Sequence, residues 1–337
     1  MKAWQYSTAT GGLQKTLKLT TLPLPTLSPA HSAAEVLIQV LSAALNPADY
    51  KLPELGLVSH VMIRTPAVPG MDFCGRVVKA TSTVDSLRIG ELVFGRLDAS
   101  QHGTLAEYIA VPAKMCTSLP DGVDPDIGAT LGVAGLTAYK VIAPNVKAGD
   151  KVFINGGSGG TGTFGIQIAK ALGCQVTVSC STGKIELCRS LGADEVIDYT
   201  TTDVAQALKE GGLAFALCVD NVGSPAGLYK AADGFLLPGG KFVQVGVPVG
   251  WQSAKTLVSR WITPAVLGGG KRPYEFFSIR GPMQAEQEQL ARWVVEGKVK
   301  PVVEQVFAFG EVPRAFEKLK TGRCAGKVVV RVVKREG

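Results

Sequence analysis

Hydrophobic residues follow two different periods along the chain, and the change between them falls near residue 121. Before it, short apolar runs alternate with turns marked by proline and glycine, and the clearest predicted strands are Glu35–Ala43, Gly75–Ala80 and Glu107–Val111. After it, strand-like runs alternate with helical stretches, as in the βαβ units that build a parallel, doubly wound sheet. We therefore predict an α/β protein with a β-rich domain and a parallel-sheet domain, because 337 residues are enough for two cores.

The second part of the chain is expected to supply the parallel sheet and the helices that cover it. Its predicted strands are Lys151–Asn155, Gln175–Cys180, Glu195–Asp198, Ala214–Asp220, Lys241–Val245 and Phe276–Ile279. Its predicted helices are Thr163–Leu172, Gly183–Leu191, Val204–Lys209 and Gln284–Glu296. The last β-like run, Gly326–Val333, is expected to return to the first domain.

A glycine-rich turn joins the first predicted strand of this sheet to its first helix. Five glycines fall within the seven residues 156–162, and two overlapping registers of GxGxxG fit them. In this strand–turn–helix context the pattern indicates a dinucleotide site, because backbone N–H groups at a helix N-terminus can approach a pyrophosphate closely. The alternative is a glycine-rich loop without a ligand. The residues predicted to bind the cofactor here are Gly157, Ser158, Gly159, Gly160, Thr161 and Gly162.

The residues about 20 positions further on favour one form of the cofactor. A carboxylate in this neighbourhood typically binds the ribose 2′-hydroxyl of NAD. Residues 179–184 contain no carboxylate, and Glu186 is the first one after them. Ser181 and Lys184 can instead donate hydrogen bonds to a 2′-phosphate, so NADPH is predicted over NADH. The alternative for Lys184 is an ordinary lysine on a helix surface.

Composition and charge narrow the classes of partner. The net charge is +7, but the basic residues are scattered without a stripe, which argues against nucleic acid and agrees with phosphorylated cofactors. No apolar run reaches the length of a membrane span, since Arg260 and Pro264 interrupt the most apolar late segment, Thr256–Gly270. The N-terminus resembles a strand and not a targeting segment, so a cytoplasmic location is expected. Seven cysteines without a CxxC pair suggest free thiols in a reducing compartment.

A series of motifs in the order of the chain carries a family resemblance. The motifs are Asn46-Pro47-Ala48-Asp49, Pro69–Gly75, Gly90–Gly95, Gly103–Tyr108, Gly132–Tyr139, the glycine turn, Gly192–Tyr199 and Gly326–Val329. Together they resemble medium-chain dehydrogenases/reductases, in particular the zinc-free quinone oxidoreductase branch with its zeta-crystallin-like members. The resemblance covers nearly the whole chain. Gly90-Glu91 departs from it, because Gly-Asp is commoner there.

The resemblance implies a domain organisation and further site residues. It implies a GroES-like catalytic domain formed by residues 1–121 and 298–337, and a Rossmann NADPH-binding domain formed by residues 122–297. Tyr199 would join Ser181 and Lys184 around the 2′-phosphate. The residues implied on the nicotinamide ribose side are Asp220, Asn221, Val222, Gly223, Val245 and Gly246. A homodimer joined edge to edge through Phe276–Ile279 would also be typical.

The sequence predicts that no zinc takes part. A catalytic zinc needs three Cys, His or carboxylate ligands. In the zinc-dependent branch of the family a cysteine stands at the place of Asn46, and a His-Glu pair lies near Gly70-Met71-Asp72; this chain has neither. Region 90–120 holds only Cys116, so the four-cysteine structural lobe is absent too.

Without a Lewis acid, conjugated acceptors are easier to reduce than simple ketones, because the negative charge is delocalised. The expected reaction is hydride transfer from NADPH to a quinone or to the C=C bond of an α,β-unsaturated carbonyl. Asn46 can donate to the substrate oxygen, and Tyr50 or Lys51 can donate a proton. The alternatives are that Asn46 caps its own turn and that Tyr50 and Lys51 only pack at the surface.

Two other functions remain open at this point. One is a dedicated trans-acting enoyl reductase of a fatty-acyl or polyketide pathway, for which Trp251–Gly270 can line an apolar pocket or, alternatively, form part of the core. The other is a non-catalytic NADPH-binding protein, since a fold does not determine a function.

Overall fold

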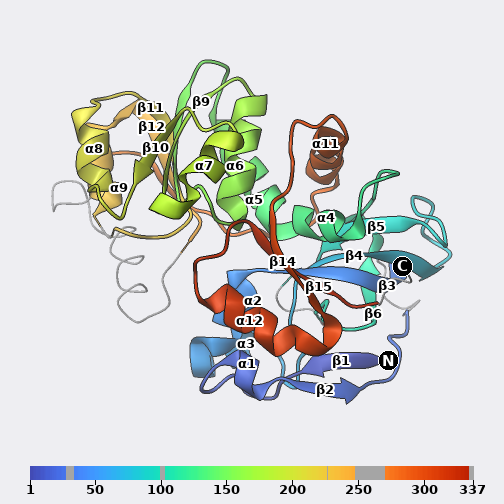
Figure 1. Ribbon diagram of the computed structural model, residues 1–337. Helices are drawn as coiled ribbons and strands as arrows, with labels where there is room; N and C mark the ends of the chain where they lie inside the picture. The colour runs from blue at the N-terminus through green and yellow to red at the C-terminus, as the bar shows by residue number, and fades with distance from the viewer. Residues whose placement is uncertain (28–33, 99–102, 226, 247–269, 334–337) are drawn as a thin grey trace. The chain divides into compact units, whose positions relative to one another are not determined.

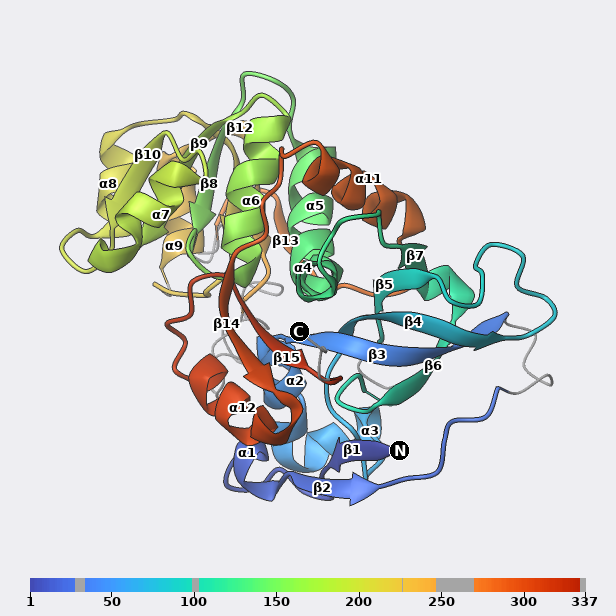
Figure 2. The same cartoon turned by 45° about the vertical axis from the view of Figure 1, so that its right-hand side comes forward.

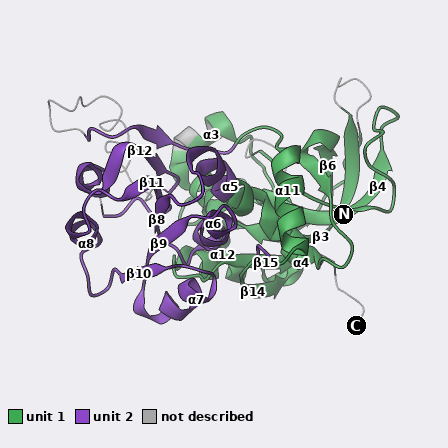
Figure 3. Cartoon of the chain, turned by 90° about the horizontal axis from the view of Figure 1, so that it is seen from above, with its two compact units in different colours: residues 1–136, 280–297, 301–337 green, residues 137–279, 298–300 purple. Residues whose placement is uncertain are grey.

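The computed structural model describes residues 1–27, 34–98, 103–225, 227–246 and 270–333, and the chain divides into two compact units (Figures 1 and 3). Unit 1 comprises residues 1–136, 280–297 and 301–337, and unit 2 comprises residues 137–279 and 298–300. The predicted pocket-lining segment Trp251–Gly270 falls almost entirely outside the described residues, which resume at Gly270.

Unit 2 contains the predicted parallel sheet. Its strands lie in the order β10-β9-β8-β11-β12-β13, and every neighbouring pair is parallel. The strands are β8 (Lys151–Asn155), β9 (Gln175–Cys180), β10 (Glu195–Asp198), β11 (Phe215–Asp220), β12 (Leu236–Gln244) and β13 (Tyr274–Phe276). The order reverses between β8 and β11, so the carboxyl ends of these two strands mark the place where such sheets bind ligands.

Helices cover the faces of this sheet, and α6 and α7 lie against the same face (Figures 1 and 2). The helices are α5 (Leu136–Ile142), α6 (Gly160–Ala171), α7 (Ile185–Ser190), α8 (Val204–Glu210) and α9 (Leu228–Ala231). Beneath α8 and α9, the rings of Phe153, Phe215 and Phe235 meet edge to face with centroids 6.1–6.2 Å apart. The alternation predicted from the sequence is confirmed in this unit.

Unit 1 is built on a second, mainly antiparallel sheet. Its order is β14-β15-β3-β4-β5-β7, and β6 pairs with β3. The strands are β3 (Glu35–Leu45), β4 (Asp72–Ala80), β5 (Leu92–Arg96), β6 (Tyr108–Pro112), β7 (Cys116–Ser118), β14 (Val303–Ala308) and β15 (Lys327–Arg331), with β1 (Lys2–Gln5) and β2 (Lys18–Thr21) as a separate pair. Because β15 pairs antiparallel with β3, the predicted return of the chain's tail to the first domain is confirmed.

Short helices complete unit 1. They are α1 (Leu13–Thr16), α2 (Pro47–Lys51), α3 (Ser59–Met62), α4 (Pro125–Thr130), α11 (Gln284–Val295) and α12 (Val312–Lys320). Two of them shift the unit boundaries away from the predicted residues 122 and 298. The Asp126 carboxylate of α4 accepts from Ser42 at 2.5 Å and from Arg331 at 2.7 Å, which ties α4 to β3 and β15. Gln284 and Gln287 of α11 donate to the Cys116 and Met115 carbonyls at the edge of β7.

The stretch Pro125–Asn145 contains α4, a π-helical segment (Leu131–Gly135) and α5. It is long and apolar enough to cross a membrane by length and composition, which corrects the sequence prediction that no run reaches that length. In its most apolar stretch of 18 residues, 67% is buried inside the protein, as in a core helix. Gly132 interrupts the helical backbone with ψ −110°. Its apolar character is therefore explained by packing inside the protein.

Candidate functional site

The glycine turn connects β8 to α6 and leaves the N-terminus of that helix open. A Cβ on Gly157 would meet the side chain of Val178 at 2.7 Å, and one on Gly162 would overlap the carbonyl oxygen of Gly156. At Gly159, the N-cap of α6, the nearest atom would be 3.6 Å away, and no side chain caps the helix. The first two glycines are thus required for packing, whereas space remains where an anion would meet the helix N-terminus.

A buried hydrogen-bond network connects the carboxyl ends of β9, β8 and β11 beside this turn. Ser179 Oγ donates to Asn155 Oδ1 at 2.6 Å, and Asn155 Nδ2 donates to Asp220 Oδ1 at 2.8 Å. The same Asp220 oxygen accepts from the backbone N–H groups of Val222 at 3.0 Å and Gly223 at 2.8 Å. The network therefore fixes the loop after β11 relative to the glycine turn. Asp220 was among the residues implied from the sequence, whereas Asn155 and Ser179 were not predicted, because they look like ordinary strand residues.

The residues implied on the nicotinamide side gather at the end of β11. The N–H groups of Val245 and Gly246 donate to the Asp220 carbonyl oxygen at 2.9 and 3.1 Å. Both polar atoms of the Asn221 side chain are buried and have no hydrogen-bond partner among the described residues. A buried amide without partners requires a ligand, water or other polar group, so the residues present here fit a polar part of a cofactor.

The residues predicted around a 2′-phosphate lie at the end of β9 and β10. Ser181 is the N-cap of a single 3₁₀ turn and Lys184 is its last residue, while Tyr199 is 57% exposed just after β10. A neighbouring carboxylate was not predicted: Asp198 lies opposite Cys180 in the sheet register. Hydrogen bonds from Thr182 (2.5 Å) and Thr200 (2.7 Å) hold the pKa of Asp198 below its usual range. No local pattern signals this carboxylate, because it reaches the site through strand pairing.

The predicted catalytic residues lie in unit 1, on α2 and at its N-cap. Asn46 adopts an extended conformation (φ −127°, ψ 152°), Pro47 begins the helix, and the backbone N–H of Asn46 donates to Asp49 Oδ2 at 2.6 Å. Tyr50 and Lys51 at the end of the helix are both half-buried. The ammonium of Lys320 lies 5.4 Å from the centre of the Tyr50 ring.

The side chain of Asn46 belongs to a buried charged cluster that sequence reasoning did not predict. Asn46 Nδ2 donates to Asp72 Oδ2 at 2.8 Å, and Lys327 Nζ donates to Asn46 Oδ1. Lys327 Nζ also lies 3.2 Å from Asp72 Oδ2, and both charged side chains are almost fully buried. Lys327 is the first residue of a valine run, and Asp72 is the first residue of an apolar strand. A charged residue at the start of an apolar run was therefore the one sign in the sequence that these side chains are buried together.

Burial shifts the pKa values of the ionisable groups around α2. It raises the pKa of Asp49 to about 7, with the charge of Asp72 adding to the effect. It lowers the pKa of Lys51 and raises that of Tyr50, where Glu54 adds to the increase. A lysine with a lowered pKa releases a proton more readily near neutral pH, whereas Tyr50 becomes a weaker acid.

Other parts of the described chain supply no metal centre. No group of three or more His, Cys, Asp or Glu side chains capable of holding a metal ion occurs among the described residues.

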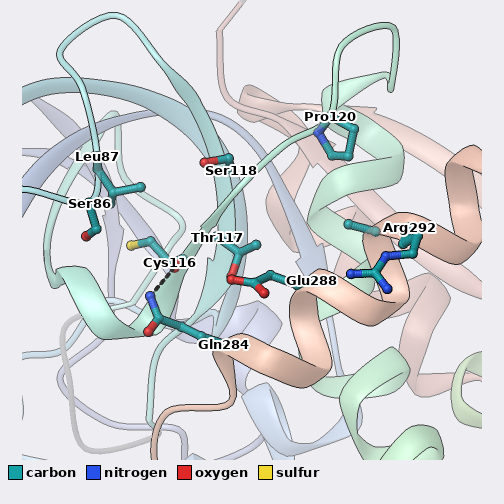
Figure 4. Close-up of a pocket in the computed structure, with 10 residues that line it drawn as sticks. Ser86, Leu87, Cys116, Thr117, Ser118, Pro120, Gln284, Glu288 and Arg292 are labelled. Atoms are coloured by element: carbon teal, nitrogen blue, oxygen red, sulfur yellow. Dashed lines mark hydrogen bonds between the residues drawn. The ribbon is translucent and has the colours of Figure 1, made fainter.

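A surface pocket of about 330 Å³ lies between β7 and α11 in unit 1 (Figure 4). Glu288 and Arg292 of α11 line it together with Thr117 and Ser118 of β7, and it contains none of the predicted site residues.

Comparisons with known proteins agree with this architecture. Residues 32–121 match the alcohol dehydrogenase GroES-like domain family, and residues 191–330 match the zinc-binding dehydrogenase family. The chain is 47% identical to the trans-enoyl reductase pgmF of Aspergillus terreus, over 98% of this chain and 96% of the relative. It is 33% identical to a 2-methylene-furan-3-one reductase of Solanum lycopersicum, over 98% and 79% of the two chains. The solved quinone oxidoreductase from Coxiella burnetii matches with a TM-score of 0.84 and 28% identity, over 99% of each chain.

Proposed function

The chain belongs to the medium-chain dehydrogenase/reductase superfamily and is an oxidoreductase, and we propose that it reduces the C=C bond of α,β-unsaturated carbonyl compounds with NADPH. The observation that carries the proposal is the 47% identity to a trans-enoyl reductase over nearly the whole length of both chains. This similarity favours a substrate with an enoyl group. The proposal includes the case in which the protein acts in trans and receives its substrate from another protein.

The strand ends and glycine turn of unit 2 would hold the cofactor. The open N-terminus of α6 offers its N–H groups to the pyrophosphate, and the unpartnered amide of Asn221 offers a donor and an acceptor. When bound, the reduced nicotinamide supplies a hydride to the conjugated substrate. The residues of the Asn155–Asp220 network keep these groups in place, because their hydrogen bonds do not depend on the ligand.

Lys51 is our proposed proton donor. Addition of hydride to an enone leaves negative charge on the carbonyl oxygen, and an acid near that oxygen or the α-carbon completes the reduction. Burial lowers the pKa of Lys51, which favours proton release, whereas burial raises the pKa of Tyr50. Asn46 has the lesser claim to bind substrate, because Asp72 and Lys327 already engage both ends of its amide.

Quinone reduction is the second candidate, favoured by the whole-length match to a quinone oxidoreductase structure. The two reactions are separated by initial rates of NADPH oxidation with a crotonyl thioester and with 9,10-phenanthrenequinone. We expect the thioester to be the better acceptor and EDTA to leave both rates unchanged. A rate with the quinone alone would replace the enoyl proposal, and loss of activity in EDTA would overturn zinc independence.

The preference for NADPH is tested at Lys184. The proposal is that Lys184 and Ser181 bind the 2′-phosphate while the two threonines occupy the oxygens of Asp198. In the variant Lys184→Met, the KM for NADPH should rise by at least about tenfold while that for NADH stays within twofold, since one charge-assisted contact is worth about 1.5–3 kcal/mol. Equal effects on both cofactors would contradict the assignment. The variant Lys170→Met, which removes a half-buried lysine paired with Asp194, is the matched control.

The edge strand β13 is the proposed contact between two copies of the chain. A homodimer through the edge strand β13 is expected, with the 38% exposed Phe276 at the contact. Sedimentation of the wild type and of Phe276→Glu would test it, because a charge at that edge should shift a dimer toward monomers. We also propose that the enzyme works in the cytoplasm.

A further inference from the structure

The buried cluster of Asn46, Asp72 and Lys327 joins three segments that are distant in sequence. Asn46 ends β3 and precedes α2, Asp72 opens β4, and Lys327 opens β15. All three side chains are 3% exposed or less. Placing an ammonium and a carboxylate in such an environment removes both ions from water, and their mutual attraction must offset that desolvation penalty. A buried pair of this kind is therefore weak evidence for a stabilising role, and the arrangement that it holds is the feature to explain.

The hydrogen bonds of Asn46 show what this arrangement holds. Its Nδ2 donates to Asp72 at 2.8 Å and approaches the Ala44 carbonyl at 3.4 Å, and its Oδ1 accepts from Lys327. The amide can therefore take only one orientation, because a flipped amide would set its NH2 group against the ammonium. The backbone N–H of Asn46 donates to Asp49, so the same residue fixes the first turn of α2.

The cluster also reaches the kinked helix between α4 and α5. Asp72 Oδ1 accepts from the N–H of Val133 at 2.7 Å, next to Gly132, where the helical backbone is interrupted. A Cβ on Gly132 would overlap this carboxylate oxygen. The Asp72 carboxylate therefore packs directly against the backbone at the kink. Both oxygens of Asp72 are thus engaged, one with the kinked helix and one with Asn46 and Lys327.

We propose that Lys327 is a positioning residue for the reaction: by binding Asn46 and Asp72 together, it fixes the start of α2 and thereby the helix that carries Lys51. This inference rests on the proposed function, because it takes Lys51 as the proton donor. Lys327 itself does not contact substrate in this proposal. Its role is exerted through the Asn46 amide and the one turn of helix that follows.

The test compares Lys327→Met with a matched variant on the same strand, Arg331→Met. Arg331 pairs with the buried Asp126 at 2.7 Å, so both variants remove a cation of β15 from a buried carboxylate. We expect Lys327→Met to lower kcat for the crotonyl thioester at least tenfold while the Kd for NADPH stays within twofold. Arg331→Met should lower the Tm but leave kcat within twofold. Lys327→Arg, which keeps the charge, should retain more of kcat than Lys327→Met.

A double variant keeps the test decisive if Lys327→Met does not fold. Lys327→Met with Asp72→Asn removes both charges, leaves no unpaired carboxylate, and retains an oxygen that can accept from Val133. A folded double variant with wild-type kcat would overturn the proposal. An equal loss of kcat in Lys327→Met and Arg331→Met would overturn it as well, because the effect would then follow stability alone.

A second readout separates this inference from the proposed function. Acetylation of Lys51 by acetic anhydride, followed across pH by peptide mass spectrometry, reports the pKa of Lys51 without any turnover. Release of α2 in Lys327→Met should expose Lys51 and raise its pKa toward the ordinary lysine value, whereas Arg331→Met should leave it unchanged. An unchanged labelling profile in Lys327→Met would contradict the positioning role. If the wild type reduces no enoyl substrate but the labelling shift occurs, the function fails while the positioning contact stands.

Discussion

Each unit of the protein contains a buried pair of an asparagine amide and an aspartate carboxylate at strand ends. In unit 1, Asn46 Nδ2 lies 2.8 Å from Asp72, and in unit 2, Asn155 Nδ2 lies 2.8 Å from Asp220. The geometry of the two pairs is alike, but their surroundings differ. Asp72 contacts the ammonium of Lys327, while Asp220 accepts from the backbone N–H groups of Val222 and Gly223.

This difference shows two ways of using a buried carboxylate. The unit 1 pair depends on a side-chain cation from a strand 255 residues further along the chain, so it joins β4, α2 and β15. The unit 2 pair depends on N–H groups two and three residues away, so it shapes the loop at the end of one strand. The first arrangement positions a helix, and the second positions a loop where a cofactor would bind. The first should also be much more sensitive to the loss of one charge.

The largest expected effect comes from neutralising the two carboxylates separately. Asp72→Asn would leave Lys327 buried without a counter-ion, and we expect a loss of about 3–5 kcal/mol in the free energy of unfolding. Asp220→Asn keeps a carbonyl oxygen that can accept the two backbone N–H bonds, so a loss of about 1–3 kcal/mol is expected. Urea unfolding of both variants provides the measurement. Similar losses would remove the distinction between the two regions.

A pH dependence of stability should distinguish the regions next. Burial raises the pKa of Asp49 from 3.8 to about 7, so the folded protein binds this proton more tightly than the unfolded chain does. Between these two values the unfolding free energy should therefore fall as the pH rises, by at most about 1.4 kcal/mol per pH unit. Asp49→Asn should flatten that slope, because the amide does not titrate.

The carboxylate of Asp198 in unit 2 provides a control with the opposite sign. Its pKa is lowered by hydrogen bonds from Thr182 and Thr200, so its contribution is present at neutral pH and is lost as the pH falls. Asp198→Asn should therefore leave the slope between about pH 5 and 7 unchanged, because the group is ionised in both the folded and the unfolded state there. A slope that stays the same in Asp49→Asn would show that another group titrates in this range.

The two regions also differ in how far the sequence predicts them. The glycine turn, β8 to β11 and the helix after the turn followed from local periodicity and composition, because each depends on residues close in sequence. The partners of Asn46 were not predicted, because Asp72 and Lys327 reach it only through the pairing of β3 with β4 and β15.

The boundaries of the two compact units differ from the predicted residues for the same physical reason. Helix α11 was assigned by sequence order to the parallel-sheet domain, but its glutamines bond the edge of β7 in unit 1. The last strand was expected at Phe276–Ile279 and forms at Tyr274–Phe276, where Tyr274 packs against Tyr229 and donates to Gln244. Both outcomes depend on contacts between distant side chains, which the alternation of polar and apolar residues does not encode.

The smallest of the expected effects concerns the network of unit 2 and its influence on the cofactor. Asn155 Oδ1 accepts from Ser179, and its Nδ2 donates to Asp220 and to the Ser224 carbonyl at 2.6 Å, so it ties the glycine turn to the loop after β11. Asn155→Leu keeps the volume but removes these bonds, and we expect the Kd for NADPH, measured by fluorescence titration, to rise about tenfold, or about 1.4 kcal/mol. Asn145→Leu, at a half-buried asparagine that bonds the Val141 carbonyl, should leave this Kd within twofold. An unchanged Kd in Asn155→Leu would mean that the loop keeps its conformation without the amide, and that the backbone N–H bonds to Asp220 suffice.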